Sequence, residues 1–313
     1  MLNIDRIAKP RKKKVRWQLW LLLSPSLVYL LIFCYLPMLG IIIAFKDYSP
    51  SLGLAGIFTS EWVGFKHFVN FFTYPSFWSI LKNTLVLSLY ALVVNTIVPI
   101  VLALVINEVH NKVFKNIFQT ISYAPYFVSL VVLVGICGSF LQGPNSVFNV
   151  IGGFFGLPPK NILSEQSLFS TVYTLSGLWQ GLGWWTIIYV GTLSNVDRTL
   201  HEAAAIDGAS RFRRIISINI PAIIPVATIQ FILAMGSMMS IGFEKVYMFQ
   251  SSIGDLTMSV TEIISTFTYR VAFEESRNFS FATAVGLFNS VINIILLFGT
   301  NFIAKKVGKE SLW

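Results

Sequence analysis

The chain has 313 residues, of which 55% are hydrophobic and only 12% are charged. Because a soluble domain carries about 25% charged residues, this composition excludes a water-soluble globule and requires lipid as the solvent. The net charge of +9 at pH 7 does not indicate a nucleic-acid-binding protein, since the lysines and arginines flank apolar runs instead of forming one basic face.

The chain opens with a basic stretch, residues 1–16, which is followed by the first apolar run, residues 17–45. About 20 apolar residues are enough to cross a membrane. This run is longer and contains Pro25 and Pro37, which predicts a tilted or kinked span, or a span whose early part is interfacial. A cleaved signal peptide would have a shorter apolar stretch and an A-x-A-like site, so we expect an uncleaved first span.

Five further apolar runs are long enough to cross a membrane, and they occupy residues 80–106, 117–141, 168–193, 220–243 and 281–303. The six runs predict an all-α membrane protein with six transmembrane helices over residues 17–303. With a cytoplasmic N-terminus, 16 of the 23 lysines and arginines fall on the cytoplasmic side. Because cytoplasmic loops are enriched in Lys and Arg, we expect both termini, including the tail 304–313, in the cytoplasm.

A polar segment, "HEAAAIDGASRFRRIISINIPAIIP", lies between the fourth and fifth apolar runs. Asp207-Gly208 predicts a turn between two short helices, since Gly tolerates a positive φ. The alanines before this turn leave little side chain, so a partner surface could approach the helix closely. An ordinary cytoplasmic loop, with basic residues that only anchor it at the membrane, is the alternative. An apolar stripe is expected after the turn, formed by Phe212, Ile215, Ile216 and Ile220.

This segment resembles the EAA loop of the membrane permeases in binding-protein-dependent ABC importers. The pattern of that family is E-A-A, three residues, G, nine residues and I-x-L-P. Here Glu202-Ala203-Ala204 is followed at the same spacing by Gly208 and by Ile218-Asn219-Ile220-Pro221. The one departure is Ile220 in place of Leu, which conserves side-chain volume. The cytoplasmic position expected from the charges agrees with this resemblance.

The resemblance extends over nearly the whole chain. Phrases such as "LKNTLVLS" and "GFEKVYMFQSSIGD" resemble the carbohydrate-uptake members of the family, and the basic N-terminus, "FKDY" and "WVGF" are closest to the polysaccharide or oligosaccharide permease subgroup. The resemblance implies a type I ABC importer permease fold and a multi-pass location in the bacterial plasma membrane. It further implies a non-catalytic subunit that forms half of the pathway for an oligosaccharide.

The resemblance also implies partners. These are a second, related permease subunit that makes a heterodimer, two cytoplasmic ATPase subunits, an external substrate-binding protein and the surrounding lipid. The chain itself lacks the phosphate-loop pattern G-x-x-x-x-G-K-[ST], so we expect ATP and Mg²⁺ to bind the ATPase subunits and no cofactor to bind this chain. Residues 195–220 are implied to contact the ATPase, with the coupling role assigned to Glu202, Ala203, Ala204, Asp207, Gly208, Ile218 and Pro221.

Polar and aromatic residues within the apolar runs are the candidates for contact with a sugar, which needs hydroxyl partners and flat faces for stacking. The candidates are Trp179, Gln180, Trp184, Trp185, Gln230, Asn289 and Asn293. Each has an alternative role: tryptophans near span ends are often interface anchors, and Asn or Gln side chains often bond a neighbouring helix.

Two other functions are weighed against an oligosaccharide permease. A permease of the same family could carry another solute, such as a simple sugar, a polyol or a glycerol phosphate. A secondary carrier or membrane enzyme would be expected to keep acidic, histidine or metal-ligand clusters within the membrane. The sequence shows none: the histidines His67, His110 and His201 are far apart in loops, and Cys34 and Cys137 lie alone in apolar stretches.

Overall fold

The computed structural model describes residues 17–163, 165, 168–253, 261–308 and 310–313, and these residues are almost entirely helical. Up to residue 141 the α-helices are α1 (Trp17–Tyr29), α2 (Leu36–Met38), α3 (Gly56–Thr59), α4 (Lys66–Phe72), α5 (Phe77–Glu108), α6 (Lys112–Tyr123) and α7 (Leu130–Leu141). The later α-helices are α8 (Val147–Phe154), α9 (Phe169–Ser194), α10 (Arg198–Ile206), α11 (Arg211–Arg214), α12 (Ile220–Gly236), α13 (Phe243–Ile253), α15 (Ile264–Tyr269) and α16 (Phe279–Lys306).

Several turns of 3₁₀- or π-helix continue or join these elements. The 3₁₀ turns are η2 (Leu39–Phe45), η3 (Pro50–Ala55), η4 (Ala124–Phe127) and η6 (Met238–Ser240). The π turns are η1 (Leu30–Tyr35), η5 (Ile215–Asn219) and η8 (Arg270–Glu274). The described residues contain no β-strand, and their one isolated β-bridge joins Lys46 to Trp62. The all-α class expected from the sequence is therefore confirmed for the part of the chain that the structure describes.

Four continuous helices are long and apolar enough to cross a membrane. They run over Trp17–Phe45, Phe77–Glu108, Arg211–Gly236 and Phe279–Lys306. The fourth predicted run forms α9, which has 26 residues but is interrupted by Ser, Thr, Gly and Trp and is not among the four. At about 1.5 Å per residue, α9 spans about 39 Å, and it packs along α5.

The third predicted span is not one straight helix. The helical stretches Lys112–Phe127 and Leu130–Leu141 meet at 98°. Two extended residues at the junction, Val128 and Ser129, account for the bend, and the Ser129 hydroxyl accepts a hydrogen bond from the N–H of Val132 (3.4 Å) as α7 begins. If this bent pair is one span, the described residues hold five candidate spans.

The fifth predicted span also differs from its expected limits of 220–243, because the helix begins at Arg211 and ends at Gly236. Pro221 therefore lies inside a continuous helix and not in its first turn. A proline has no backbone N–H to donate, and its ring clashes with the carbonyl four residues earlier in an α-helix. The π turn η5 ends at Asn219, two residues before Pro221, and it includes Ser217, so it widens the helix where that clash would occur.

A cluster of aromatic rings joins α4, α5, α15 and α16. Phe71 is 1% exposed, and its ring lies 5.0 Å from Phe77, 6.0 Å from Phe267 and 6.3 Å from Phe281, measured between centroids. Such ring pairs contribute about 0.5–1.5 kcal/mol each beyond their buried area. Nearby, a mostly buried ion pair joins Arg270 to Glu262 at 2.6 Å. This end of the helix bundle is therefore firmly connected.

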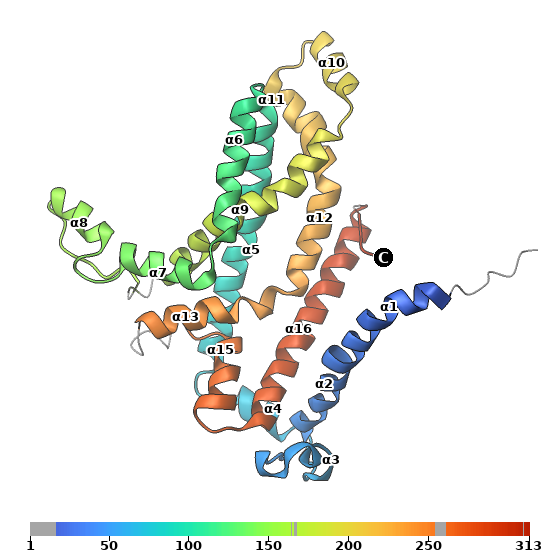
Figure 1. Cartoon of the computed structure of the whole chain (residues 1–313), viewed down its shortest axis with the longest axis vertical. Helices are drawn as coiled ribbons and strands as arrows, with labels where there is room; N and C mark the ends of the chain where they lie inside the picture. The colour runs from blue at the N-terminus through green and yellow to red at the C-terminus, as the bar shows by residue number, and fades with distance from the viewer. Residues whose placement is uncertain (1–16, 164, 166–167, 254–260, 309) are drawn as a thin grey trace, which may run out of the picture.

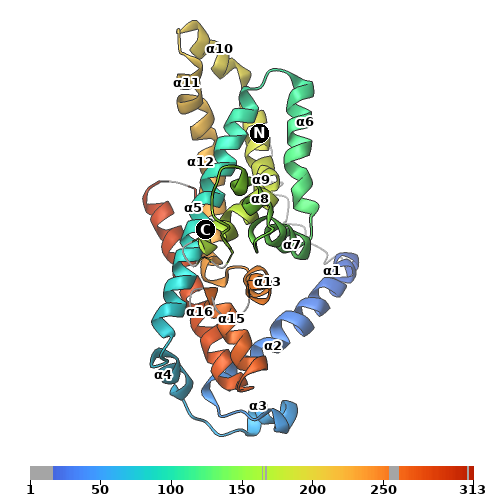
Figure 2. The same cartoon turned by 90° about the vertical axis from the view of Figure 1, so that its left-hand side faces the viewer.

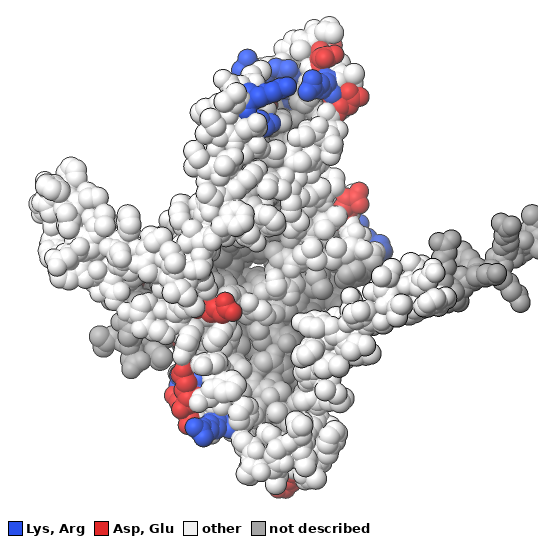
Figure 3. All heavy atoms as spheres, viewed as in Figure 1, with Lys and Arg blue, Asp and Glu red and all other residues white. Residues whose placement is uncertain are grey.

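Figures 1 and 2 show α10 and α11 at one end of the long axis and α3 and α4 at the other. The helix that starts with α1 departs from the rest of the molecule, and only 6% of its most apolar window is buried. Lysines and arginines gather around α10 and α11, and most of the surface between the two ends is uncharged (Figure 3). This distribution suits a chain whose middle faces lipid.

Candidate functional site

Residues 197–214 form a helical hairpin, α10 and α11, that protrudes from one end of the molecule (Figure 1). Each helix has its own N-terminal cap. The Asp197 carboxylate accepts a hydrogen bond from the N–H of Thr199 (2.9 Å), which lowers the pKa of Asp197 below its ordinary value. The Ser210 hydroxyl accepts a hydrogen bond from the N–H of Arg213 (3.3 Å). Local sequence thus specifies both helix starts.

The turn of the hairpin is a Schellman motif centred on Gly208. Gly208 has φ 73°, its N–H donates to the Ala205 carbonyl (3.1 Å), and the N–H of Ala209 donates to the Ala204 carbonyl (2.9 Å). A Cβ atom at position 208 would meet no atom within 4 Å, but this backbone conformation is unfavourable for an L-residue. Glycine is therefore required here because of its positive φ, and not because a larger residue would clash with a neighbour. The turn expected at Asp207-Gly208 is present.

The outer surface of the hairpin is exposed and partly apolar. Glu202, Ala203 and Asp207 are exposed, and Ala204 is half-buried. Ile206 is 87% exposed and Phe212, in the expected apolar stripe, is 71% exposed. Two large apolar side chains are thus exposed at a protruding tip that also carries charged residues.

The hairpin is joined to the centre of the molecule by one unbroken helix. This helix starts at Arg211 and includes Ile218, which is half-buried, and Pro221 before it ends at Gly236. Asn219 is fully buried, and its Nδ2 atom lies 3.5 Å from the Glu108 carboxylate at the end of α5. The sequence comparison with the EAA pattern did not single out Asn219 or Glu108.

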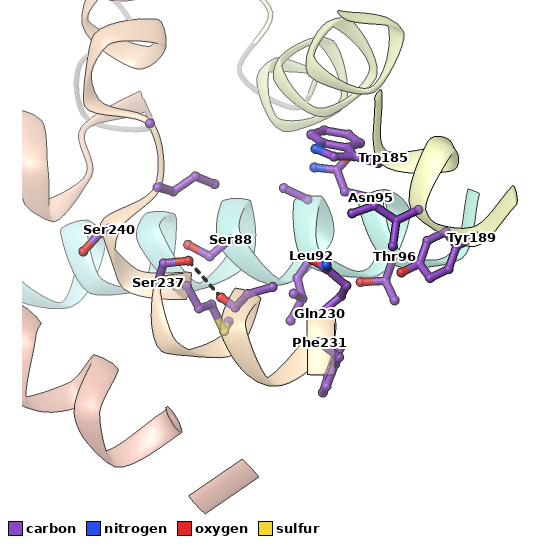
Figure 4. A pocket seen from close by; sticks show the side chains of 16 residues that line it. Ser88, Leu92, Asn95, Thr96, Trp185, Tyr189, Gln230, Phe231, Ser237 and Ser240 are labelled. Carbon is purple, nitrogen blue, oxygen red and sulfur yellow. Dashed lines mark hydrogen bonds between the residues drawn. The ribbon is translucent and has the colours of Figure 1, made fainter. Parts of the chain in front are cut away.

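Two adjoining cavities lie at the other end of this helix. The first cavity, of about 390 Å³, lies between α5, α9 and α12, and Figure 4 shows Asn95, Trp185 and Gln230 around it. The second cavity, of about 450 Å³, lies between α9, η4 and α13. Their walls share four residues, Ala91, Asn95, Trp185 and Ile241.

Three of the predicted pathway residues line these cavities: Trp185 lines both, Gln230 the first and Gln180 the second. The Gln180 amide also donates a hydrogen bond to the Val128 carbonyl at the bend between α6 and α7 (2.7 Å). Trp179 and Trp184 are about half exposed and are not among the lining residues. The Trp184 ring stacks on Tyr126, with centroids 4.7 Å apart.

Asn289 and Asn293 bind a neighbouring segment of the chain. Both side-chain amides donate to the Ser240 hydroxyl, at 3.3 and 2.8 Å, and the Asn293 carbonyl oxygen accepts from the N–H of Met239 (2.9 Å). These hydrogen bonds hold the break between α12 and α13 against α16. Ser240 in turn lines the first cavity, so the two asparagines shape the cavity from outside it.

Several buried polar atoms in the cavity walls have no hydrogen-bond partner in the part of the chain that the structure describes. They are the Ser88 and Thr174 hydroxyls and the side-chain oxygen of Asn95. Ser88 is 3% exposed and Thr174 is 1% exposed. Because a buried polar group without a partner is costly, these atoms suit a ligand that carries hydroxyl groups.

Lys245, which follows the fifth predicted apolar run of residues 220–243, also lines the second cavity. It is 7% exposed, its ammonium group donates to the Tyr173 carbonyl (2.7 Å), and it lies 4.5 Å from the centre of the Tyr173 ring. Burial lowers the pKa of Lys245 to about 8, so the ammonium group remains mostly charged at pH 7. Its neighbour Glu244 is exposed, and the hydrophobic periodicity of the sequence did not show which of these two charged residues would be buried.

Among the described residues, no three His, Cys, Asp or Glu side chains gather as metal ligands.

Comparisons with known proteins cover most of the chain. The family model "Binding-protein-dependent transport system inner membrane component" matches residues 95–309. Protein LplB of Bacillus subtilis (strain 168) is 42% identical over 301 residues, which cover 96% of this chain and 92% of that protein. The polygalacturonan/rhamnogalacturonan transport system permease protein YteP of the same organism is 41% identical over 295 residues, with 94% and 90% coverage.

A solved structure is similar over the same length. One chain of a bacterial alginate ABC transporter, in complex with an alginate pentasaccharide-bound periplasmic protein, matches with a TM-score of 0.85 and 31% sequence identity. The match covers 95% of this chain and 96% of that chain.

Proposed function

This chain belongs to the family of inner membrane components of binding-protein-dependent transport systems, and from that premise we propose that it forms half of an oligosaccharide pathway in an ATP-driven importer of the bacterial plasma membrane. The other half is a second, related permease subunit. Two cytoplasmic ATPase subunits bind the hairpin side, and a substrate-binding protein delivers the sugar from outside. Transport systems for polygalacturonan and rhamnogalacturonan and for alginate, which include similar chains, support a saccharide as substrate.

The cavities supply the chemistry that a sugar needs. Trp185, Tyr126 and Tyr173 offer ring faces, and the unpartnered oxygens of Ser88 and Asn95 offer hydrogen-bonding positions. A polyhydroxylated ring can satisfy these oxygens and stack on the ring faces at once, whereas an apolar solute would leave them unpaired. Substrate therefore passes between α5, α9 and α12.

The helical hairpin couples this pathway to ATP hydrolysis. Ala203 and Ala204 let the ATPase surface approach α10 closely, Glu202 pairs with a basic group of that surface, and Gly208 makes the turn. Asp207, Ile218 and Pro221 keep the hairpin aligned with α12. The observation that carries this proposal is the unbroken helix Arg211–Gly236, because it joins the exposed hairpin directly to Gln230 in the cavity wall. ATP-driven closure of the ATPase pair moves the hairpin and thereby the cavity wall.

The proposal is tested by reconstituting the chain in liposomes, alone and with its partner permease, both ATPase subunits and the binding protein. We expect labelled oligosaccharide to enter only with the complete set and with ATP on the hairpin side, and we expect the isolated chain to hydrolyse no ATP. Uptake by the isolated chain, or uptake driven by an ion gradient without ATP, would contradict the proposal. Parallel uptake assays with a polyol and with glycerol phosphate distinguish an oligosaccharide permease from a permease of the same family that carries one of these solutes.

A further inference from the structure

The second cavity contains a buried cation whose charge is not balanced by any described carboxylate. Lys66 and Lys160, in contrast, are exposed and pair with Asp47 and Glu165 at 3.2 and 3.1 Å. Lys245 is buried, and its described partners are the Tyr173 carbonyl and ring. A buried charge is costly unless an opposite charge or several hydrogen bonds compensate it.

The geometry leaves the ammonium group accessible to a ligand. An ammonium group has three N–H donors, and the Tyr173 carbonyl occupies one of them. On the facing helix, a Cβ atom at Gly177 would lie 2.9 Å from the Lys245 nitrogen. Glycine at this position therefore makes room for the ammonium group itself, and Gly177 and Lys245 both line the cavity.

The neighbouring groups fit a sugar and not a bare anion. The Thr174 hydroxyl, one residue after Tyr173, is buried and has no described partner, and the side-chain oxygen of Asn95 on the opposite wall also has none. The Trp185 and Tyr126 rings line the same cavity. A single ammonium group beside hydroxyl partners and aromatic faces matches a sugar ring that carries one negative charge.

We propose that Lys245 binds the carboxylate of an acidic oligosaccharide in the second cavity, while Thr174 and Asn95 bind hydroxyl groups of the same ligand. This inference rests on the proposed function and deepens it, because it names uronate-containing oligosaccharides as the substrate class that this subunit selects. The ligand takes the two remaining N–H donors of the ammonium group. Lys245 is thus a specificity-determining residue of the pathway.

The test uses the assembled membrane complex in nanodiscs, without the binding protein, so that the selectivity of the binding protein does not enter. The probes are a galacturonate trisaccharide and its methyl ester, which differ in charge but have the same ring and linkage. We expect the unesterified trisaccharide to bind about tenfold to a hundredfold more tightly, the range of one charge-assisted hydrogen bond. Lys245→Met should remove this preference and Lys245→Arg should keep most of it.

Two further variants complete the test. Gly177→Ala should weaken the preference by displacing the ammonium group, and Lys160→Met, at an exposed lysine, should leave it unchanged. Equal binding of the two trisaccharides by the unaltered complex, absence of binding of both, or an undiminished preference in Lys245→Met would each overturn the inference. Tighter binding of a phosphorylated sugar than of the galacturonate would also overturn it.

Failure of this inference can be told apart from failure of the proposed function. Uptake of a neutral oligosaccharide by the complete transporter depends on the hairpin and on ATP but not on the charge of Lys245. If the complex imports a neutral sugar and shows no preference for the acidic one, only the role of Lys245 is wrong. If no saccharide is imported by the complete transporter, the proposed function is wrong.

Discussion

Gly208 shows how one residue can be required for its backbone alone. Its φ of 73° closes the Schellman turn, and no neighbouring atom crowds the position. For an L-residue this conformation costs about 1–2 kcal/mol. The cost falls on a turn of two short helices whose outer face is exposed, where little packing is available to offset it.

We therefore expect Gly208→Ala to reduce uptake and Gly208→Asp, which also adds a charge to the exposed patch, to abolish it. Both variants should still insert in the membrane, because the hairpin lies outside the lipid-facing helices. The measurement is ATP-dependent uptake, normalised to the amount of chain in the membrane. Gly191→Ala is the control, since Gly191 lies in α9 with a negative φ and open space. Normal uptake by Gly208→Asp would rule out the coupling role of the hairpin.

At this scale the sequence predicted the turn well and the buried charge badly. Asp207-Gly208 is a local signal, and the caps Asp197 and Ser210 are also local, so the hairpin could be deduced without the rest of the chain. Lys245 becomes buried only because α13 folds back against α9, which brings together residues 72 positions apart. Composition and periodicity contain no information on such a contact.

At the scale of elements, the break between α12 and α13 is held by side chains of α16. Asn293 makes two hydrogen bonds there, to Ser240 and to the N–H of Met239, whereas Asn289 makes one, at 3.3 Å, and its own carbonyl oxygen has no partner in the described chain. Losing one partner of a buried hydrogen bond costs about 1–3 kcal/mol. The two asparagines are one turn apart and so form a matched pair.

We expect Asn293→Ala to destabilise the chain by about 1–3 kcal/mol and Asn289→Ala to destabilise it less, because fewer hydrogen bonds are lost. The measurement is thermal denaturation of the assembled complex in detergent. Asn293→Ala should also lower uptake, since Ser240 lines the first cavity. An equal loss of stability in both variants would show that the bond to the Met239 N–H does not hold the break.

The lengths of the elements were harder to predict than their existence. Each of the six apolar runs contains helix, but the third is bent by 98°, and the fifth begins nine residues and ends seven residues earlier than expected. Hydropathy cannot place these boundaries. Val128 and Ser129 are themselves compatible with a helix, and Pro221 signals a helix start unless a π turn precedes it. Both outcomes depend on packing against α9 and α5.

At the scale of the whole molecule, the charges indicate which side each loop faces. The hairpin carries three arginines in its second helix, and α16 ends in Lys305 and Lys306. Because cytoplasmic segments are enriched in such residues, we expect both on the cytoplasmic side. The connection around Lys160, between α8 and α9, is then expected outside.

We expect a membrane-impermeant maleimide to label Ile206→Cys only in inside-out vesicles and Lys160→Cys only in right-side-out vesicles. Both positions are exposed, so the reagent can reach them once it is on the correct side. The background chain should lack Cys34 and Cys137, the two native cysteines. Labelling of both positions from the same side would contradict the expected arrangement, in which both termini are cytoplasmic.

The unbroken helix Arg211–Gly236 has unequal arms on either side of its buried polar residue, Asn219. At about 1.5 Å per residue, the arm toward the hairpin measures about 12 Å and the arm toward the cavity about 26 Å. If this helix pivots at Asn219, beside Glu108, a displacement of its hairpin end produces a displacement about twice as large, and in the opposite direction, at its cavity end. A small closing movement below the membrane would then open a wider gap within it.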